Sequence, residues 1–106
     1  MKRYEIRWAE LDPTVGTEMA KTRPVVIVSL DVLNERLNTV TVCLLTSQRH
    51  PTWRTRLGVR VAKRPVEIAV DQIRTLIKSR LGRKLGALTA SEANALRRLI
   101  TEMYGE

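Results

Sequence analysis

The sequence predicts a mainly β (α+β) fold, a small antiparallel β-barrel with short helical turns and a C-terminal amphipathic helix. Short apolar or alternating stretches recur along the chain, and turn-forming residues separate them. Near the C-terminus, apolar side chains instead follow one another at helical spacing. The 106 residues are the size of one domain, so we expect a single domain over residues 1–106.

The composition indicates an aliphatic core and an acidic or polyanionic partner. Hydrophobic residues make up 43% of the chain, but aromatic residues only 4%, and phenylalanine is absent. The net charge is +8 and the isoelectric point is near 10.6. So strong a basic bias favours nucleic acid or an acidic protein as partner over solubility alone.

Other features of the sequence exclude several classes of protein. No apolar run approaches the roughly 20 residues that a membrane span needs. The N-terminal residues are followed by no signal-type apolar segment, so we expect a cytoplasmic protein. Cys43, the single cysteine, fits no disulfide or zinc spacing and is expected to be a buried thiol. Nothing pairs it with His50, the single histidine, so we expect no Cys–His nucleophile.

Residues 4–10 alternate and predict a half-buried strand. Ile6 and Trp8 face inward in this interpretation, whereas Glu5 and Arg7 face outward. Trp8 is expected in the core or at a dimer interface. Residues 11–16 carry turn chemistry and open a long polar loop.

Residues 25–28 are an unbroken, mostly β-branched run and predict a strand buried on both faces. Pro24 is expected at the first residue of this strand, where its missing N–H has least effect. Proline also keeps Arg23 extended, because the residue before a proline avoids the helical region. Arg23 is therefore expected where a loop meets a rigid strand, a common place for binding and catalysis.

The middle of the chain predicts a short helix and another strand. Residues 31–38 are expected to form one or two helical turns, with Asp31 as candidate cap. Residues 39–45 alternate as a strand, and this strand ends in two hydroxyls, Thr46 and Ser47.

The second half continues in the same manner. Residues 48–56 form a polar, basic loop, residues 57–62 a strand and residues 63–65 a turn. Residues 66–70 predict a short strand, and residues 71–77 continue it in extended form.

The C-terminal region predicts the main helix. Residues 78–84 are basic and are expected to start with one helical turn, and residues 85–88 are a short apolar stretch. Thr89 and Glu92 have the spacing of a capping box. Helically spaced apolar residues follow at Ala93, Leu96, Leu99, Ile100 and Met103.

Four blocks in this order resemble the PemK/MazF family of toxin endoribonucleases. They are Leu11-Asp12-Pro13 with Gly16-Thr17-Glu18, Thr22-Arg23-Pro24-Val25, Leu45-Thr46-Ser47, and Asp71-Gln72-Ile73-Arg74-Thr75 with Lys78-Ser79-Arg80-Leu81. Any one block is weak evidence, but four in the right order are strong. The resemblance covers nearly the whole chain, from about Tyr4 to Leu88.

The resemblance implies a homodimeric SH3-like barrel of a type II toxin–antitoxin system. Members cut single-stranded mRNA at short sequences, with no metal ion and no cofactor, and leave 2′,3′-cyclic phosphate and 5′-hydroxyl ends. An acidic MazE/PemI-like antitoxin protein neutralises them. No membrane partner is implied.

The resemblance also implies the functional residues. Arg23 and Thr46 match the two family residues that matter most, and Asp71 matches an aspartate that some members use. Some members have an arginine where this chain has Ala69, and a histidine where it has Thr17. The predicted RNA-binding residues are Thr17, Glu18, Lys21, Ser47, Arg49, Trp53, Arg54, Gln72 and Arg74.

These side chains suit RNA cleavage, in which the 2′-hydroxyl attacks the neighbouring phosphate. Arg23 can clamp two phosphate oxygens, although its high pKa makes it a poor general base. Thr46 can donate and accept a hydrogen bond there. Asp71 is the carboxylate candidate for the base, or else it forms a surface salt bridge with Arg74. His50 is expected to stack on a base or to lie at the surface.

Two other functions remain open at this point. The same basic face suits a non-catalytic barrel that binds single-stranded nucleic acid. A related fold poisons DNA gyrase, but such toxins resemble one another at a Trp-Gly-Ile chain end, whereas this chain ends Met103-Tyr104-Gly105-Glu106.

Overall fold

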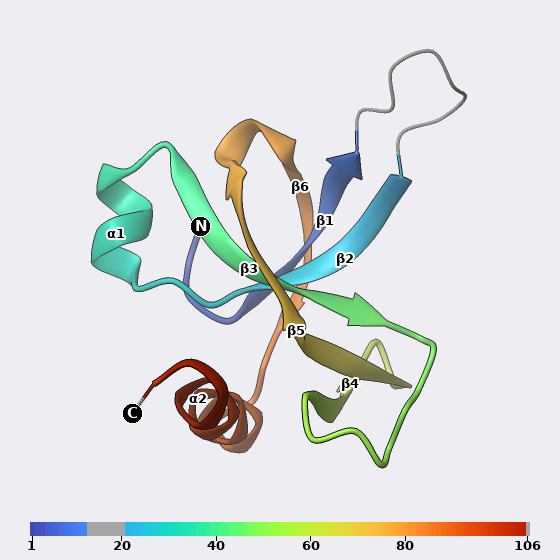
Figure 1. Ribbon diagram of the computed structural model, residues 1–106. Coiled ribbons are helices and arrows are strands. Elements are labelled where there is room, and N and C mark those ends of the chain that lie inside the picture. The colour runs from blue at the N-terminus through green and yellow to red at the C-terminus, as the bar shows by residue number, and fades with distance from the viewer. Residues whose placement is uncertain (13–20, 106) are drawn as a thin grey trace.

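The computed structural model describes residues 1–12 and 21–105. Six antiparallel strands form one sheet in the order β4-β5-β3-β2-β1-β6, which curls into an open half-barrel (Figure 1). The predicted mainly β class with a C-terminal helix is therefore confirmed. The elements are β1 (Glu5–Asp12), β2 (Lys21–Ile27), α1 (Asp31–Arg36), β3 (Thr39–Thr46), β4 (Arg56–Val61), β5 (Arg64–Ile77), the 3₁₀ turn η1 (Lys78–Arg80), β6 (Leu81–Ala87) and α2 (Ala90–Tyr104).

Two aliphatic clusters hold the curled sheet together, one on each face. Strand β3 contributes to both, because successive side chains point to opposite faces: Cys43 and Leu45 join one cluster, and Val42 and Leu44 the other. In the neighbouring strand β2 and the residue that follows it, residues 25–28 are almost completely buried, as predicted. The central strands therefore form a rigid frame.

Helix α2 packs against the first cluster through Leu96, which is fully buried. The predicted capping box is present: the Thr89 hydroxyl accepts from the Glu92 backbone N–H, and the Glu92 carboxylate accepts from the Thr89 N–H. Within residues 1–12 and 21–105, no helix combines the length and apolar character that a membrane span requires.

The start of β2 differs from the prediction. The strand begins at Lys21, so Pro24 lies inside it and not at its first residue. The pairing of β2 with β3 begins only at Val25, and the residues before it pair with β1 alone. Proline is tolerated in this part of β2, because a strand portion with one free edge has fewer ladder bonds to lose.

Strand β1 also differs at its ends. Tyr4 lies outside it with a left-handed φ of 72°, and the strand continues past Glu10 to Asp12. Glu5 does not face solvent as predicted, but is 92% buried, since only 8% of it is exposed. Its carboxylate pairs with Arg7 at 3.0 Å and with Lys84 at 3.7 Å, and these two cations compensate the buried charge.

The two short helical regions need small corrections. The residue that caps α1 is Leu30, not Asp31, and its side chain makes no capping bond. Asp31 instead accepts a hydrogen bond from the Arg3 backbone N–H. The predicted turn at 78–80 is η1.

Strand β6 was missed by the sequence analysis, which gave residues 81–84 to a basic segment and 85–88 to a short apolar stretch. It is an edge strand with exposed Arg83 and Lys84 and two glycines, so it has little local β signal. Its pairing with β1, interrupted by two irregularities, makes it a strand.

Strand β5 is a single long strand, and the turn before it lies at Ala62 and Lys63 rather than at residues 63–65. Both residues have positive φ, as a two-residue hairpin turn requires. In the ladder with β3, Cys43 pairs with Ile73 but Leu44 with Ala69, so residues 70–72 bulge out. A bulge redirects side chains, and this one lies beside the end of β3.

Candidate functional site

The structure brings Arg23 and Thr46 together at the end of the central strands. In the antiparallel ladder of β2 and β3, Val25 pairs with Leu44. Arg23 lies two residues before Val25 and Thr46 two residues after Leu44, so both lie just beyond the end of this ladder, and both line the same two cavities. The juxtaposition on which the sequence hypothesis depends is therefore present.

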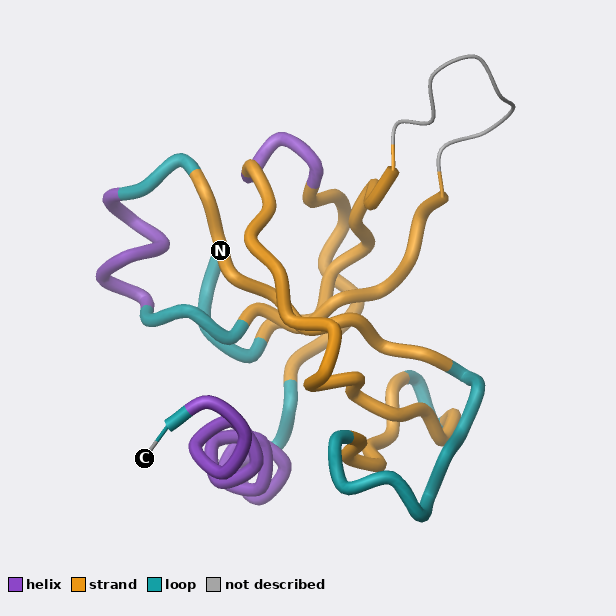
Figure 2. The backbone as a smooth tube through the Cα atoms, in the orientation of Figure 1, coloured by secondary structure: helices purple, strands orange, loops and turns teal. Residues whose placement is uncertain are grey.

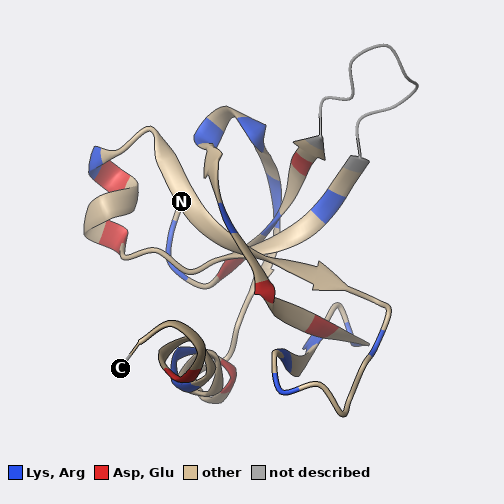
Figure 3. Ribbon diagram, in the orientation of Figure 1, with Lys and Arg blue, Asp and Glu red and all other residues tan. Residues whose placement is uncertain are grey.

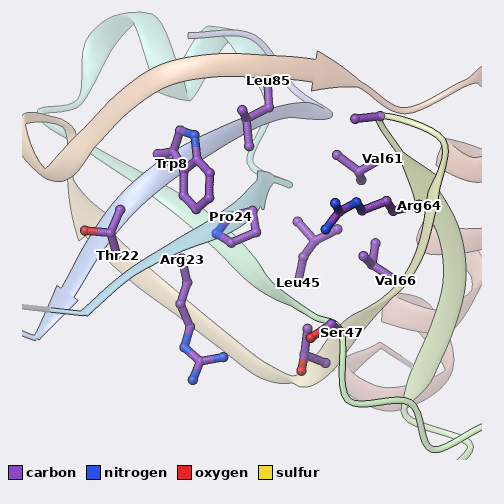
Figure 4. A pocket seen from close by; sticks show the side chains of 12 residues that line it. Trp8, Thr22, Arg23, Pro24, Leu45, Ser47, Val61, Arg64, Val66 and Leu85 are labelled. Atoms are coloured by element: carbon purple, nitrogen blue, oxygen red, sulfur yellow. The ribbon is translucent and has the colours of Figure 1, made fainter.

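Two adjoining cavities share this pair. The smaller has a volume of about 310 Å³ and the larger of about 620 Å³, and Arg23, Leu45 and Thr46 line both. Figure 4 shows the larger cavity, with Trp8 beside Pro24 at one side and Arg64 extending towards Leu45 from the other. Arg23 and Thr46 thus lie where the smaller, polar cavity meets the larger, apolar one.

The smaller cavity is lined by basic residues. Its described lining residues include three arginines, Arg23, Arg56 and Arg74, and no carboxylate, although Arg56 is paired with two acids that lie outside the lining. Gln48 and Gln72 add amide groups to the same wall. A hollow with guanidinium groups and neutral hydrogen-bonding groups suits a phosphate.

Thr46 is oriented by its own turn. Its Oγ1 accepts a hydrogen bond of 3.1 Å from the Gln48 backbone N–H. The hydroxyl hydrogen stays available for donation, because this bond uses only an oxygen lone pair. Within the described residues, Arg23 is exposed and its guanidinium makes no ion pair.

The bulge in β5 separates the predicted residues on that strand. Gln72 and Arg74 line the smaller cavity, but Asp71 is not among the residues that line it. Asp71 forms a salt bridge, and its partner is Arg56 at 3.1 Å rather than the predicted Arg74. Burial by itself raises the pKa of Asp71, but a hydrogen bond from Thr55 and the ion pair with Arg56 outweigh it, so the pKa is lowered.

Residues 47–55 form the loop between β3 and β4, part of the backbone that Figure 2 colours as loop. The predicted RNA-binding residues of this loop have different surroundings. Ser47 lines the larger cavity. Trp53 is stacked on His50, with ring centroids 3.9 Å apart and planes inclined by 10°. Arg54 forms an ion pair with Glu102 of α2, and Arg49 is exposed and lines another hollow, to which Arg56 also contributes.

Three predicted RNA-binding residues belong to the segment before β2 or to its first position. Thr17 and Glu18 fall outside the described residues. Lys21 is the first residue of β2, and its backbone pairs with Asp12 of β1. Figure 3 shows basic positions on β2, near the turn between β5 and β6, on β4 and on α2, so the positive charge is spread over the fold.

Sequence reasoning missed three residues of the site. Arg56 was assigned to a polar, basic loop, but its side chain is only 7% exposed and is paired with Glu67 and Asp71. Arg64 was assigned to a turn, but lines the larger cavity as the first residue of β5. Trp8, expected in the core or at an interface, lines that cavity too. No local signal identifies them, because strands distant in the chain bring them together.

Cys43 is buried, as predicted. Burial raises the pKa of its thiol to about 12, with a smaller contribution from the negative charge of Asp71. The thiol is therefore protonated at neutral pH and is a poor nucleophile.

Comparison with known proteins gives a consistent result. Residues 2–104 match the family model of the PemK-like, MazF-like toxin of type II toxin–antitoxin systems. The endoribonuclease MazF of Staphylococcus saprophyticus is 34% identical over 94 residues, which cover 84% of this chain and 78% of that protein.

Two solved structures also resemble this chain. The toxin MazF-mt6 of Mycobacterium tuberculosis has a TM-score of 0.79 at 29% identity, covering 94% of this chain and 95% of that one. An endoribonuclease solved with its cognate antitoxin, from a mycobacterial species, has a TM-score of 0.82 at 24% identity and covers 99% and 95% of the two chains. The second likeness is one of fold.

Proposed function

Because this chain belongs to the PemK-like, MazF-like toxin family of type II toxin–antitoxin systems, whose MazF relatives are endoribonucleases, we propose that it cuts single-stranded mRNA at the cavity that Arg23 and Thr46 share. The cleavage is sequence-specific and needs no metal ion, and the 2′-hydroxyl of the RNA is the nucleophile. The products carry 2′,3′-cyclic phosphate and 5′-hydroxyl ends.

One observation carries the proposal: a cavity lined by Arg23, Arg74 and the Thr46 hydroxyl, with no carboxylate among its described lining residues. The third arginine of the cavity, Arg56, is paired with Glu67 and Asp71. Such a cavity attracts a phosphodiester, and the Thr46 hydroxyl in it is already oriented by the Gln48 backbone N–H. Preorganised donors are the main source of stabilisation when charge develops on a reacting group.

The cleavage step places two of this chain's residues at the phosphate. The 2′-oxygen bonds to the adjacent phosphorus and gives its proton to water, while the bond from phosphorus to the 5′-oxygen breaks and that oxygen takes a proton from water. Arg23 holds the two non-bridging oxygens as they gain charge. Thr46 donates its hydroxyl hydrogen to the same phosphate.

Asp71 has the least support of the three proposed catalytic residues. It is not among the residues of the cavity, and its lowered pKa reduces its strength as a general base near neutral pH. We therefore place Arg23 and Thr46, rather than Asp71, at the reacting phosphate.

We also propose a homodimer and an acidic antitoxin as partners. The net charge of +8 favours an acidic partner that competes with RNA for the same cavity. Around α1, exposed apolar side chains offer a surface for a second copy. They are Leu30, Val32, Leu33 and Leu37, with Ile77 at the end of β5.

The decisive experiment is incubation of the pure protein with a mixed-sequence RNA in EDTA, followed by sequencing of the cut ends. We expect cleavage at a short recurring sequence, with cyclic phosphate and 5′-hydroxyl ends. RNA that is bound but stays intact both in EDTA and in a parallel reaction with added Mg²⁺ would instead identify a non-catalytic binding module. Cleavage that EDTA abolishes would refute the metal-independent chemistry while keeping the nuclease.

A further inference from the structure

We propose that Arg56, paired with Glu67, is a positioning residue that fixes the loop 47–55 beside the cleavage cavity, so that single-stranded RNA meets an ordered loop. Arg56 is not a member of the sequence blocks that resemble the family, and although it lines the smaller cavity, its guanidinium is engaged by Glu67 and Asp71. The inference rests on the proposed function.

Arg56 is a buried cation between two acids. Its side chain is 7% exposed, and that of Glu67 is 5% exposed. The guanidinium lies 3.7 Å from the Glu67 carboxylate and 3.1 Å from that of Asp71. Buried charges are retained only when paired, so each group depends on the others.

The charged cluster of Arg56, Glu67 and Asp71 contacts the loop 47–55 at two points. The Glu67 carboxylate accepts a 2.8 Å hydrogen bond from the His50 backbone N–H. The Arg56 guanidinium lies 4.8 Å from the centre of the Trp53 ring, which is stacked on His50. A cation over an indole is attracted to it, so Arg56 and Glu67 together hold the middle of the loop.

The position of Arg56 links this loop to the cavity. It is the first residue of β4 and pairs with Ala69, directly before the bulge of β5. It also lines the smaller cavity with Arg23 and Thr46. One of its nitrogens, Nη1, is buried and has no hydrogen-bond partner among the described residues. The Glu67 carboxylate lies 3.7 Å from this nitrogen, beyond hydrogen-bond distance.

An ordered loop matters for affinity. A loop that must be ordered on binding loses conformational freedom at that moment, and the observed affinity falls accordingly. With Arg56 and Glu67 in place, the loop that carries Ser47 and Trp53 is ordered before RNA arrives. The pair should therefore affect substrate binding more than the chemical step.

The test requires a variant that keeps the fold. Removing Arg56 alone leaves Glu67 charged and buried without its near partner, which destabilises strongly. Replacing both in the double variant Arg56→Met/Glu67→Met substitutes apolar groups of similar size, a change that is often neutral or stabilising. Arg60→Met, on the same strand but exposed, is the matched control.

We expect the double variant to fold, with urea unfolding close to that of the wild type. Amide hydrogen exchange of residues 48–55 becomes at least about tenfold faster, because the loop opens locally. The KM for RNA rises about tenfold, on the scale of one lost base–aromatic stack, while kcat changes less than about threefold. Affinity for single-stranded DNA, which lacks the nucleophile, falls with the KM.

Three results would overturn the inference. The first is unchanged loop exchange, and the second is a faster-exchanging loop with unchanged KM and DNA affinity. The third is a fall in kcat at constant KM, because Arg56 would then act on the chemical step. If the double variant does not fold, Arg56→Lys keeps the charge but removes the planar group over Trp53, and the same shifts are expected. If the wild-type protein binds single-stranded DNA but cuts no RNA, the proposed function is refuted. The inference about the loop is then still tested by the hydrogen-exchange and DNA-affinity measurements.

Discussion

Arg23 offers the most direct test of the cleavage site, through Arg23→Lys and Arg23→Ala. The side chain is exposed and makes no described ion pair, while its backbone pairs with Ala9 in the ladder of β1 and β2. Substitution therefore leaves the ladder intact. As at other exposed positions, we expect the free energy of unfolding to change by no more than about 0.5 kcal/mol.

The loss of activity follows from the number of donors removed. A lysine keeps the positive charge but replaces the two-donor fork with a single ammonium group. Losing one preorganised donor at a reacting centre reduces the rate by roughly 100- to 1,000-fold. A 100-fold loss corresponds to about 2.7 kcal/mol of activation free energy. Arg23→Ala removes both donors and the charge, so the loss should exceed that of Arg23→Lys.

The assay is single-turnover cleavage of an RNA that the wild type cuts, with circular dichroism and urea unfolding as controls for the fold. Arg98→Ala, an exposed arginine of α2, is the matched control for loss of one positive charge. Our reasoning is wrong if Arg23→Lys cleaves within about threefold of the wild type. It is equally wrong if Arg98→Ala loses as much activity as Arg23→Ala.

Three further predictions concern neighbouring groups. Thr46→Val should reduce the cleavage rate by roughly 100-fold while Thr46→Ser stays near the wild type, since only serine keeps the donor; equal rates for the two would exclude a role of the hydroxyl. Burial alone raises the pKa of Asp71, but the hydrogen bond from Thr55 and the ion pair with Arg56 lower it on balance. The ionised Asp71 therefore stabilises the fold at pH values above its unfolded pKa of about 3.9, and this stabilisation is lost as the pH falls through the lower folded pKa. Urea unfolding between pH 7 and 3 should therefore depend less on pH in Asp71→Asn than in the wild type, and an identical profile would contradict this. The Cys43 thiol, with a pKa of about 12, should resist iodoacetamide at pH 8 until the protein is unfolded in urea, and rapid alkylation of the native protein would show that the site is open.

Local pattern was sufficient where the physical cause is local. The helix at the C-terminus could be predicted, because its capping box and its spacing of apolar residues lie within one segment. The alternation along β3 placed Cys43 and Leu44 on opposite faces correctly. Strand β6 could not be predicted, because its glycines and exposed cations carry no strand signal and only pairing with β1 forms it.

The sequence by itself determined the family, the β class and the nomination of Arg23 and Thr46, since each depends on the order of residues along the chain. Only the tertiary structure decided that these two lie at one cavity, that Asp71 pairs with Arg56 and that Glu67 is a buried acid. Ladder register and a bulge in β5 set these contacts between residues far apart in the chain, and burial gives each charge a partner that no local spacing specifies.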